Sequence, residues 1–404
     1  MPECPTGLGL LLEHASRWGE LVLDYEEEAY IQPPFWFIIR QLGRMPQLRS
    51  LSIKCQNEPG LAWMELLKSI SESLPKEAMS RIKLSSLSLD GLVGFGYSPS
   101  DYFSSAFLSS HITSLDINVT PEITLLMLEA CPKVVTARLA LPLSIRVHES
   151  VREYQPRVHP HLRDMTLEIY GLDHGAGGDV EEPFFPHDVF CLILDRATCP
   201  ALVSLSLLAN RDLPMLPRGD ERADDNVTNN LPFLPASIET FLIRSGVSES
   251  LWSFTLNNLP IADDKLKYLL EAMPNIRELT LGNPVRDPGS TLKLVTVVDS
   301  HILKWISDPS RLQCLQHIHL IVHSDLCISA SVSLRMKVSN GRLASILLEF
   351  IDNSPGESSI GVYAALQEQG VAIRVRVMQH DGWEVFGHSG VVAPPTFRCE
   401  CTFR

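Results

Sequence analysis

The sequence predicts an α/β fold of the solenoid type, a horseshoe with short parallel strands on the inside and helices on the outside. Three observations predict it. A short apolar string returns ten times along the 404 residues, the stretches between strings carry helical apolar stripes, and within each string apolar and polar residues alternate. Self-similarity at this spacing is typical of repeat architectures, in which a unit buries its apolar face only by stacking on its neighbours.

The recurring string has an apolar residue, two others, an apolar residue, one other and an apolar residue. Its last two apolar positions share one face of a β-strand, and the residue between them faces the other way. The ten strings are Trp18/Leu21/Leu23, Leu48/Leu51/Ile53, Leu84/Leu87/Leu89, Ile112/Leu115/Ile117, Val134/Ala137/Leu139, Leu162/Met165/Leu167, Leu202/Leu205/Leu207, Leu251/Phe254/Leu256, Ile276/Leu279/Leu281 and Leu315/Ile318/Leu320. Ile238/Phe241/Ile243 also fits but begins only 13 residues before Leu251, so we interpret it as a local strand.

The stretches before several strings have the period of an amphipathic α-helix. Stripes at i, i+3, i+4 and i+7 begin at Leu8, Phe35, Trp63, Ile123 and Leu266. A proline recurs just before a string, in Met45-Pro46, Cys131-Pro132, Cys199-Pro200 and Met273-Pro274. Because proline disfavours helical backbone at the residue before it, we expect each helix to end there and a strand to follow.

A doubly wound α/β domain also alternates strands with helices and is the alternative architecture. Its strands are buried on both faces and read as continuous apolar runs. The strings here read LSSLSL, ITSLDI, LVSLSL and IRELTL, with polar residues at the intervening positions. This alternation favours a sheet with one solvated face, and therefore the solenoid.

The repeats define the expected domain organisation. Residues 1–377 are predicted to form one solenoid of about ten irregular repeats. Two segments rich in turn-forming and acidic residues, 171–187 and 209–235, are predicted to be inserted loops. Residues 322–342 match no clean repeat, and the periodicity fails after residue 378, so 378–404 are predicted to be an irregular C-terminal tail.

Composition excludes several classes of function. The net charge is −14 and no basic run is present, which argues against nucleic acid and membrane surfaces as partners. No apolar run is long enough for a membrane-spanning helix, and the first residues lack the pattern of a signal peptide. The nine cysteines are too few for a disulfide scaffold, and several lie in apolar segments, so we expect reduced thiols and a cytoplasmic or nuclear protein.

Two glycine-containing patterns suggest chemistry but have simpler interpretations. Gly175-Ala176-Gly177-Gly178 follows a strand, but no helix opens after it and the surrounding acidic residues would repel phosphate. Gly387-His388-Ser389-Gly390 has neither the preceding strand nor the spacing of a nucleophile elbow, so a turn is favoured. We therefore predict no catalytic residue and no bound cofactor.

Two further patterns resemble metal sites. His317, His319 and His323 share strand parity, with Cys327 nearby, and we interpret them as histidines on an outward strand face. Cys399-Glu400-Cys401 spaces its thiols by one residue, where structural zinc sites use two to four. The sequence therefore predicts no metal ligand.

The residue between the last two apolar positions of a string defines a predicted protein-binding face. Its nine positions are Ser52, Ser88, Asp116, Arg138, Thr166, Ser206, Thr255, Thr280 and His319. Most are small and polar, so we expect loops 171–187 and 209–235 to supply anchors, with Phe184, Phe185 and Phe233 as candidates. The alternative is that these aromatic side chains pin the loops to the core.

The strings resemble leucine-rich repeats, whose LxxLxL strand is followed by an asparagine that bonds the backbone of the turn. Asn210 has the family's spacing after Leu202/Leu205/Leu207, and Asn283 comes one residue early. Segments 10–23, 196–207, 269–281 and 365–377 narrow the resemblance to the repeat region of the large fungal F-box/leucine-rich-repeat families.

That resemblance implies a protein-recognition module, the substrate receptor of an F-box-type ubiquitin ligase. In such proteins an N-terminal F-box docks on the adaptor of a cullin-RING ligase and the repeats hold the substrate. No F-box precedes the first helical stripe here, so we expect this chain alone not to bind the adaptor. Two other functions stay open: a stand-alone binding or inhibitory repeat protein, and, more remotely, an α/β enzyme.

The charge also predicts the kind of partner. An acidic chain is expected to prefer a protein with a basic or mixed surface and to associate more slowly as salt rises. Asp220, Glu221, Asp224 and Asp225 form a candidate steering element in the second loop. The alternative is that these charges only solvate the loop.

Overall fold

The computed structural model is an α/β protein with open parallel sheets. It describes residues 6–25, 38, 42–55, 83–90, 111–119, 121–142, 156–170, 186–209, 233–259, 261–284, 297–308, 310–322, 343–351, 370–379 and 396–402. The chain divides into two compact units. Unit 1 comprises Met1–Tyr170 and Leu192–Leu202, and unit 2 comprises Gly171–Cys191 and Val203–Arg404.

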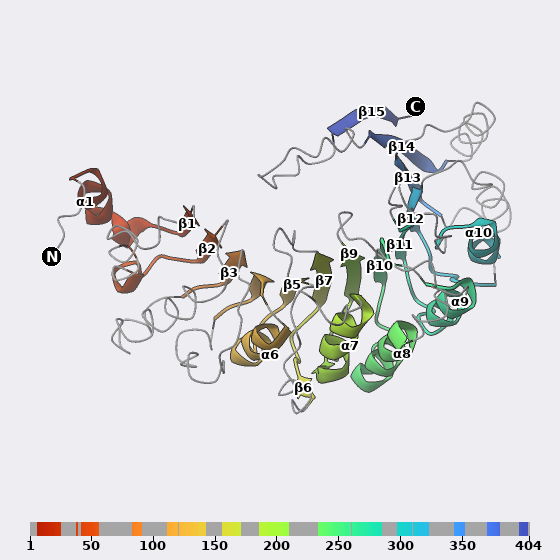
Figure 1. Ribbon diagram of the computed structural model, residues 1–404, viewed down its shortest axis with the longest axis horizontal. Helices are drawn as coiled ribbons and strands as arrows, with labels where there is room; N and C mark the ends of the chain where they lie inside the picture. Colours follow the sequence, from red (N-terminus) through yellow and green to blue (C-terminus); the bar gives the residue numbers. More distant parts are fainter. Residues whose placement is uncertain are drawn as a thin grey trace, which may run out of the picture. The chain divides into compact units, whose positions relative to one another are not determined.

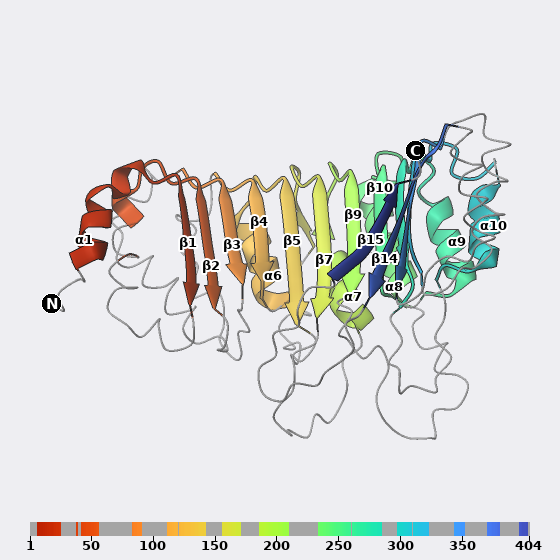
Figure 2. The same ribbon diagram turned by 90° about the horizontal axis from the view of Figure 1, so that it is seen from above.

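The described strands of the unit 1 sheet pair in parallel and in chain order (Figure 2). They are β1 (Glu20–Tyr25), β2 (Ser50–Cys55), β3 (Ser86–Asp90), β4 (Ser114–Asn118), β5 (Thr136–Pro142) and β7 (Asp164–Tyr170). The short strands β6 (Arg157–Val158) and β8 (Ala197–Thr198) form a separate parallel pair. The helical elements are α1 (Thr6–Glu13), the 3-10 turns η1 (Ala15–Arg17) and η2 (Leu42–Arg44), and α6 (Pro121–Ala130).

Unit 2 has the same arrangement. Its parallel strands, also in chain order, are β9 (Ser204–Ala209), β10 (Ser253–Asn257), β11 (Glu278–Gly282), β12 (His317–Val322), β13 (Ser345–Ile351) and β14 (Ala372–Gln379). Strand β15 (Thr396–Thr402) joins β14 antiparallel. Helices α8 (Phe233–Ser245), α9 (Asp263–Glu271) and α10 (Ser300–Ser307) lie side by side on one face of this sheet (Figure 1), while α7 (Pro186–Arg196) spans the boundary between the units.

All ten predicted strings form strands in the predicted order, which confirms the α/β prediction. The register aligns their apolar positions, so Leu51 pairs with Leu87 in unit 1 and Leu279 pairs with Ile318 in unit 2. These side chains are buried, whereas the intervening residue Thr280 is half-buried on the other face. Burying such a side chain contributes roughly 1.5–3 kcal/mol.

The X-Pro dipeptides form a repeated turn into the strand. In the four predicted places the carbonyl of a buried Met or Cys accepts a hydrogen bond from the N–H three residues later, at 3.0–3.4 Å. His159-Pro160 makes the same turn before β7, with Leu162 N 3.3 Å from His159 O. Proline suits the second position of such a turn because its φ is fixed. As predicted, α6 and α9 end just before Cys131-Pro132 and Met273-Pro274.

A main-chain carbonyl at each strand entrance joins one repeat to the next. In unit 1, Gly19 O accepts hydrogen bonds from Arg49 N at 2.7 Å and Ser50 N at 3.1 Å. In unit 2, Trp252 O accepts from Arg277 N at 2.7 Å and Glu278 N at 2.9 Å. The same paired acceptance recurs at Arg49, Ser85, Thr113 and Val135 in unit 1 and at Val203, Arg277 and Gln316 in unit 2.

The predicted local strand at Ile238/Phe241/Ile243 is wrong, because these residues lie within helix α8. Ile238, Phe241 and Leu242 are buried while Ile243 is exposed. Positions i, i+3 and i+4 share one face of a helix, whereas a strand would have buried Ile243 together with Phe241.

Three strands follow the last of the ten strings along the chain. Leu343/Ile346/Leu348 has the same spacing, is buried and carries β13; Ile373 and Val375 are buried in β14. Strand β15 falls in segment 378–404, where no apolar period predicts it.

Several predicted features lie outside the described residues. They are the stripe from Trp63, most of the stripe from Phe35, residues 171–185 and 210–232 of the two loops, segment 323–342, Phe184, Phe185, Asn210, the four acidic residues at 220–225, His323, Cys327, and the Gly175–Gly178 and Gly387–Gly390 patterns.

Candidate functional site

The strands collect the nine predicted face positions into one row per unit. In unit 1, register pairing joins Val22, Ser52, Ser88, Asp116, Arg138 and Thr166. In unit 2 it joins Ser206, Thr255, Thr280, His319, Leu347 and Arg374. Each of these residues is half-buried or exposed, and the residues before and after it in the strand are buried. We call the outward positions of β1, β2, β3, β4, β5 and β7 the unit 1 face, and those of β9 to β14 the unit 2 face.

The unit 1 face is acidic. Its outward positions carry six carboxylates and two cations: Glu20, Asp24, Asp90, Asp116, Asp164 and Glu168, against Lys54 and Arg138. Between them the strands present small hydroxyl side chains, such as Ser52 and Ser88. Short side chains leave the sheet surface open, so a bound segment would lie close to these charges.

Asp116 lies near the middle of the unit 1 face. Burial raises the pKa of its carboxyl, Arg138 acts to lower this pKa, and Asp90 and Glu168 add to the rise. Arg138 cannot compensate fully because it pairs with Glu168, with Nη2 2.7 Å and Nε 3.3 Å from Oε2. The charged form of Asp116 is therefore disfavoured in the isolated protein.

The unit 2 face has a different cluster, centred on Glu349. Glu349 Oε1 lies 3.2 Å from Arg376 Nη1, and Oε2 lies 3.1 Å from His319 Nε2. The Glu349 side chain is 9% exposed, so burial would raise its pKa, but the contacts with His319 and Arg376 outweigh burial and lower it. Beside this cluster, His317 Nδ1 lies 2.7 Å from Ser345 Oγ.

The chemistry available to the unit 2 face is limited. A Ser–His pair can serve acyl transfer when a further group orients the imidazole, but among the described residues the His317 ring has its hydrogen bond with Ser345 and none with a second, orienting group. No group of three or more His, Cys, Asp or Glu side chains within the described ranges could hold a metal ion. Cys399 and Cys401 both lie in β15, at register positions opposite Val377 and Val375.

Sequence reasoning found His319 but missed Glu349, Arg374 and Arg376. These three lie on β13 and β14, which the ten strings do not include. The spacing of Leu343/Ile346/Leu348 was the available signal, since it places Leu347 and then Glu349 on the outward face.

Buried asparagines secure the turns that leave two strands. Asn283, which the resemblance singled out, accepts from Val298 N at 2.6 Å and donates Nδ2 to Val298 O at 3.4 Å. Asn258, which sequence reasoning missed, donates Nδ2 to Ala209 O at 3.0 Å. Its φ of 59° is left-handed, a conformation that asparagine tolerates better than most residues. These asparagines have a structural role rather than a binding role.

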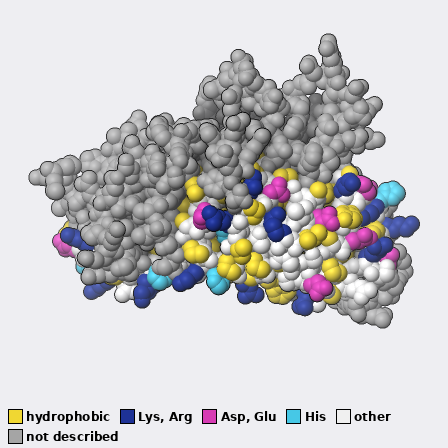
Figure 3. Space-filling view, turned by 90° about the horizontal axis from the view of Figure 1, so that it is seen from below, with side chains coloured by type: hydrophobic (Ala, Val, Ile, Leu, Met, Phe, Trp, Pro, Cys, Tyr) yellow, Lys and Arg dark blue, Asp and Glu magenta, His cyan; other side chains and the backbone are white. Residues whose placement is uncertain are grey.

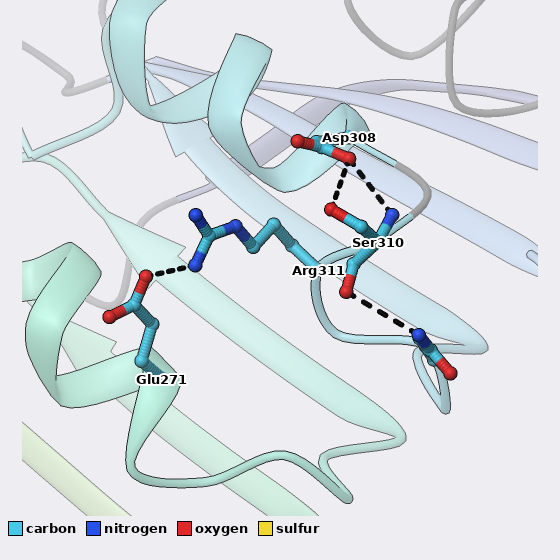
Figure 4. A network of polar contacts seen from close by, with 5 residues as sticks. Glu271, Asp308, Ser310 and Arg311 are labelled. Carbon is cyan, nitrogen blue, oxygen red and sulfur yellow. Dashed lines mark hydrogen bonds and ion pairs between the residues drawn. The ribbon is translucent and has the colours of Figure 1, made fainter.

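On the side opposite the strand faces, the residues that the structure describes show no comparable concentration of charge. Acidic, basic and apolar side chains are interspersed over its described surface (Figure 3). One network there joins the end of α9 to the turn before β12: Arg311 pairs with Glu271, while Asp308 accepts from Ser310 N at 2.8 Å and Ser310 Oγ at 2.6 Å (Figure 4). The Arg311 guanidinium also lies 5.4 Å from the centre of the Trp305 ring. Because these groups contact one another, we assign them a role in stabilising the fold.

The comparisons with known proteins give no relative. Neither a scan against protein-family models nor a search of curated proteins finds a match. Among the described helices, none has the length and apolar character needed to span a membrane.

Proposed function

We propose that the chain is a leucine-rich-repeat solenoid, an irregular horseshoe, that serves as a protein-recognition module. Local features support this architecture: strings at repeat spacing that form strands, the paired carbonyl bonds between neighbouring repeats, and asparagines at strand ends. Solenoids of this kind use their extended strand face to bind other proteins.

The observation that carries the proposal is the acidic unit 1 face around Asp116. Six strands about 4.8 Å apart span about 24 Å, enough for about seven residues of an extended segment. A Lys or Arg of a partner placed beside Asp116 would favour its charged form and offset the repulsion from Asp90 and Glu168. The partner is therefore a protein that presents a basic segment.

The specific biological role that we propose is the substrate-receptor region of an F-box-type ubiquitin ligase subunit. A stand-alone binding or inhibitory protein would use the same face, and an α/β enzyme remains the remote alternative. Affinity purification of the endogenous full-length protein separates the first two, because only a ligase subunit would retain the cullin adaptor.

Charge neutralisation on the unit 1 face tests the recognition role. We expect the triple variant Asp90→Asn/Asp116→Asn/Glu168→Gln to bind its partner at least tenfold more weakly and with a shallower salt dependence, because it removes the attraction for a basic segment. As a first measurement, a fluorescent Lys-rich peptide of seven residues can be titrated by anisotropy across a salt series.

A matched control neutralises three carboxylates outside the strand faces, Asp195→Asn/Glu249→Gln/Asp264→Asn. This variant has the same change in net charge and should bind like the parent chain. Equal weakening by the two variants would mean that total charge, and not the unit 1 face, drives association.

A further inference from the structure

We infer that the outward side of β12, β13 and β14 is a second docking surface, which binds a protein segment carrying a carboxylate next to an apolar side chain. We call this area, formed by His317, His319, Leu347, Arg374 and Arg376, the unit 2 docking surface. The inference goes beyond the proposed function, since it concerns the other unit and a partner segment of opposite charge.

Arg374 supplies the main attraction for the carboxylate. It is exposed, and it makes no hydrogen bond or ion pair with any residue whose side chain the structure describes. Its register neighbours are the uncharged residues Leu347 on β13 and Thr402 on β15. A guanidinium in this position can bind a carboxylate in the two-pronged geometry that arginine favours.

Glu349 does not cancel this attraction. Both of its oxygens face cationic or imidazole groups, Arg376 at 3.2 Å and His319 at 3.1 Å, and its side chain is 9% exposed. The Glu349 carboxylate therefore already has partners within the protein, and its contacts hold the side chains of His319 and Arg376 in place. The structure thus fixes the Arg376 and His319 side chains close to an exposed arginine.

Leu347 makes the surface selective. In the row of the unit 2 face from Ser206 to Arg374, it is the apolar member among hydroxyl, imidazole and guanidinium side chains. It is half-buried and lies between His319 and Arg374. An apolar side chain of the partner covers Leu347 while the neighbouring carboxylate reaches Arg374.

Two further acidic residues lie close to the unit 2 docking surface in the sheet register. Glu278 on β11 pairs with His317 in register. Glu400 of β15 holds the register position opposite Arg376.

Peptide binding to the full chain tests the inference. The probe is a fluorescein-labelled peptide with alternating Glu and Leu residues, compared with its Gln and Leu counterpart and measured by anisotropy. We expect the Glu peptide alone to bind, Arg374→Gln to weaken it at least tenfold, and Lys265→Gln on the outer side of α9 to leave it unchanged. Equal affinities for the two peptides, or an unchanged affinity in Arg374→Gln, would overturn the proposal.

Two further measurements separate the alternatives. Arg374→Gln should leave binding of the Lys-rich peptide unchanged, so failure at either face can be told from failure at the other. A single-stranded oligonucleotide that bound with the same dependence on Arg374 would overturn the assignment to a protein partner.

Discussion

The outward faces of the two units are built on the same parallel strands, but they shift the pKa of their central carboxylates in opposite directions. Asp116 on the unit 1 face has a raised pKa, whereas Glu349 on the unit 2 face has a lowered one. Burial acts in the same direction on both. The neighbours make the difference, because Arg138 is paired with Glu168 while Arg376 and His319 both contact Glu349.

This contrast separates two uses of a charged residue on a repeat scaffold. The charge of Glu349 stabilises the folded chain, because the fold supplies its counter-charges. The charge of Asp116 opposes folding, and a cation supplied from outside would reverse that effect. A carboxylate whose charge lowers the stability of the folded chain, on an exposed face, indicates a binding site more strongly than a carboxylate that is already paired with counter-charges of the fold.

The comparison requires equivalent cores beneath the two faces, and this gives the largest expected effect. Leu115→Ala in unit 1 and Leu279→Ala in unit 2 should each lower the free energy of unfolding by about 2–5 kcal/mol, since both side chains are 1% exposed. Thr280→Ala, on the outward face, should change it by no more than about 0.5 kcal/mol. Urea denaturation measures all three, and similar midpoints for Leu279→Ala and Thr280→Ala would refute the strand register.

Removing the charge of Glu349 should have an intermediate effect. Glu349→Gln is expected to lower the free energy of unfolding by about 1–3 kcal/mol, as for a buried charge-assisted hydrogen bond. Because its folded pKa is depressed, this contribution is fully present above the ordinary value of 4.5 and is lost as pH falls through the folded pKa. Thermal unfolding of parent and variant should therefore converge in acid; a constant difference down to the lowest pH would contradict the assigned contacts.

The smallest expected effect concerns Asp116. Asp116→Asn should leave the free energy of unfolding at neutral pH unchanged or raise it by up to about 0.5 kcal/mol, because the substitution removes a disfavoured charge. A raised folded pKa means that the penalty is present above this pKa and is relieved as pH falls through it. Carboxyl titration by NMR should place Asp116 above 3.8, and a clear destabilisation by the substitution would end the contrast with Glu349.

Sequence periodicity was sufficient for the parts of the fold that depend on local pattern. Strand positions follow from apolar residues two apart, and the Pro turns follow from the fixed φ of proline, so both could be predicted. The same string failed at Ile238/Phe241/Ile243, because Ile238, Phe241 and the apolar residue between the last two positions, Leu242, form the i, i+3, i+4 stripe of a helix, which leaves Ile243 exposed.

The Glu349 cluster could not be derived from the sequence in the same way. Its members lie on β12, β13 and β14, and of these strands only β12 carries one of the ten strings. The sheet register is what brings His319 near Glu349 and Arg376. The state of Asp116 also depends on distant residues, since Asp90, Arg138 and Glu168 come from three other strands. Periodicity predicts which face a residue occupies, but not which charges share its surroundings.

The carbonyl that accepts two N–H groups from the following repeat has a consequence for engineering. The recurring donors of this joint are main-chain N–H groups, such as Arg277 N and Glu278 N to Trp252 O, and at Arg49 and Ser85 the carbonyl also accepts from the hydroxyl of Ser85 and of Thr113. The outward side chains two or three positions further along take no part in it. If the sheet has the proposed recognition role, random substitution of the outward rows would change its binding specificity while leaving the joints intact. The chain is thus a suitable scaffold for combinatorial binder libraries. The outward side chains of successive strands would set the binding specificity, and main-chain hydrogen bonds would hold neighbouring repeats together.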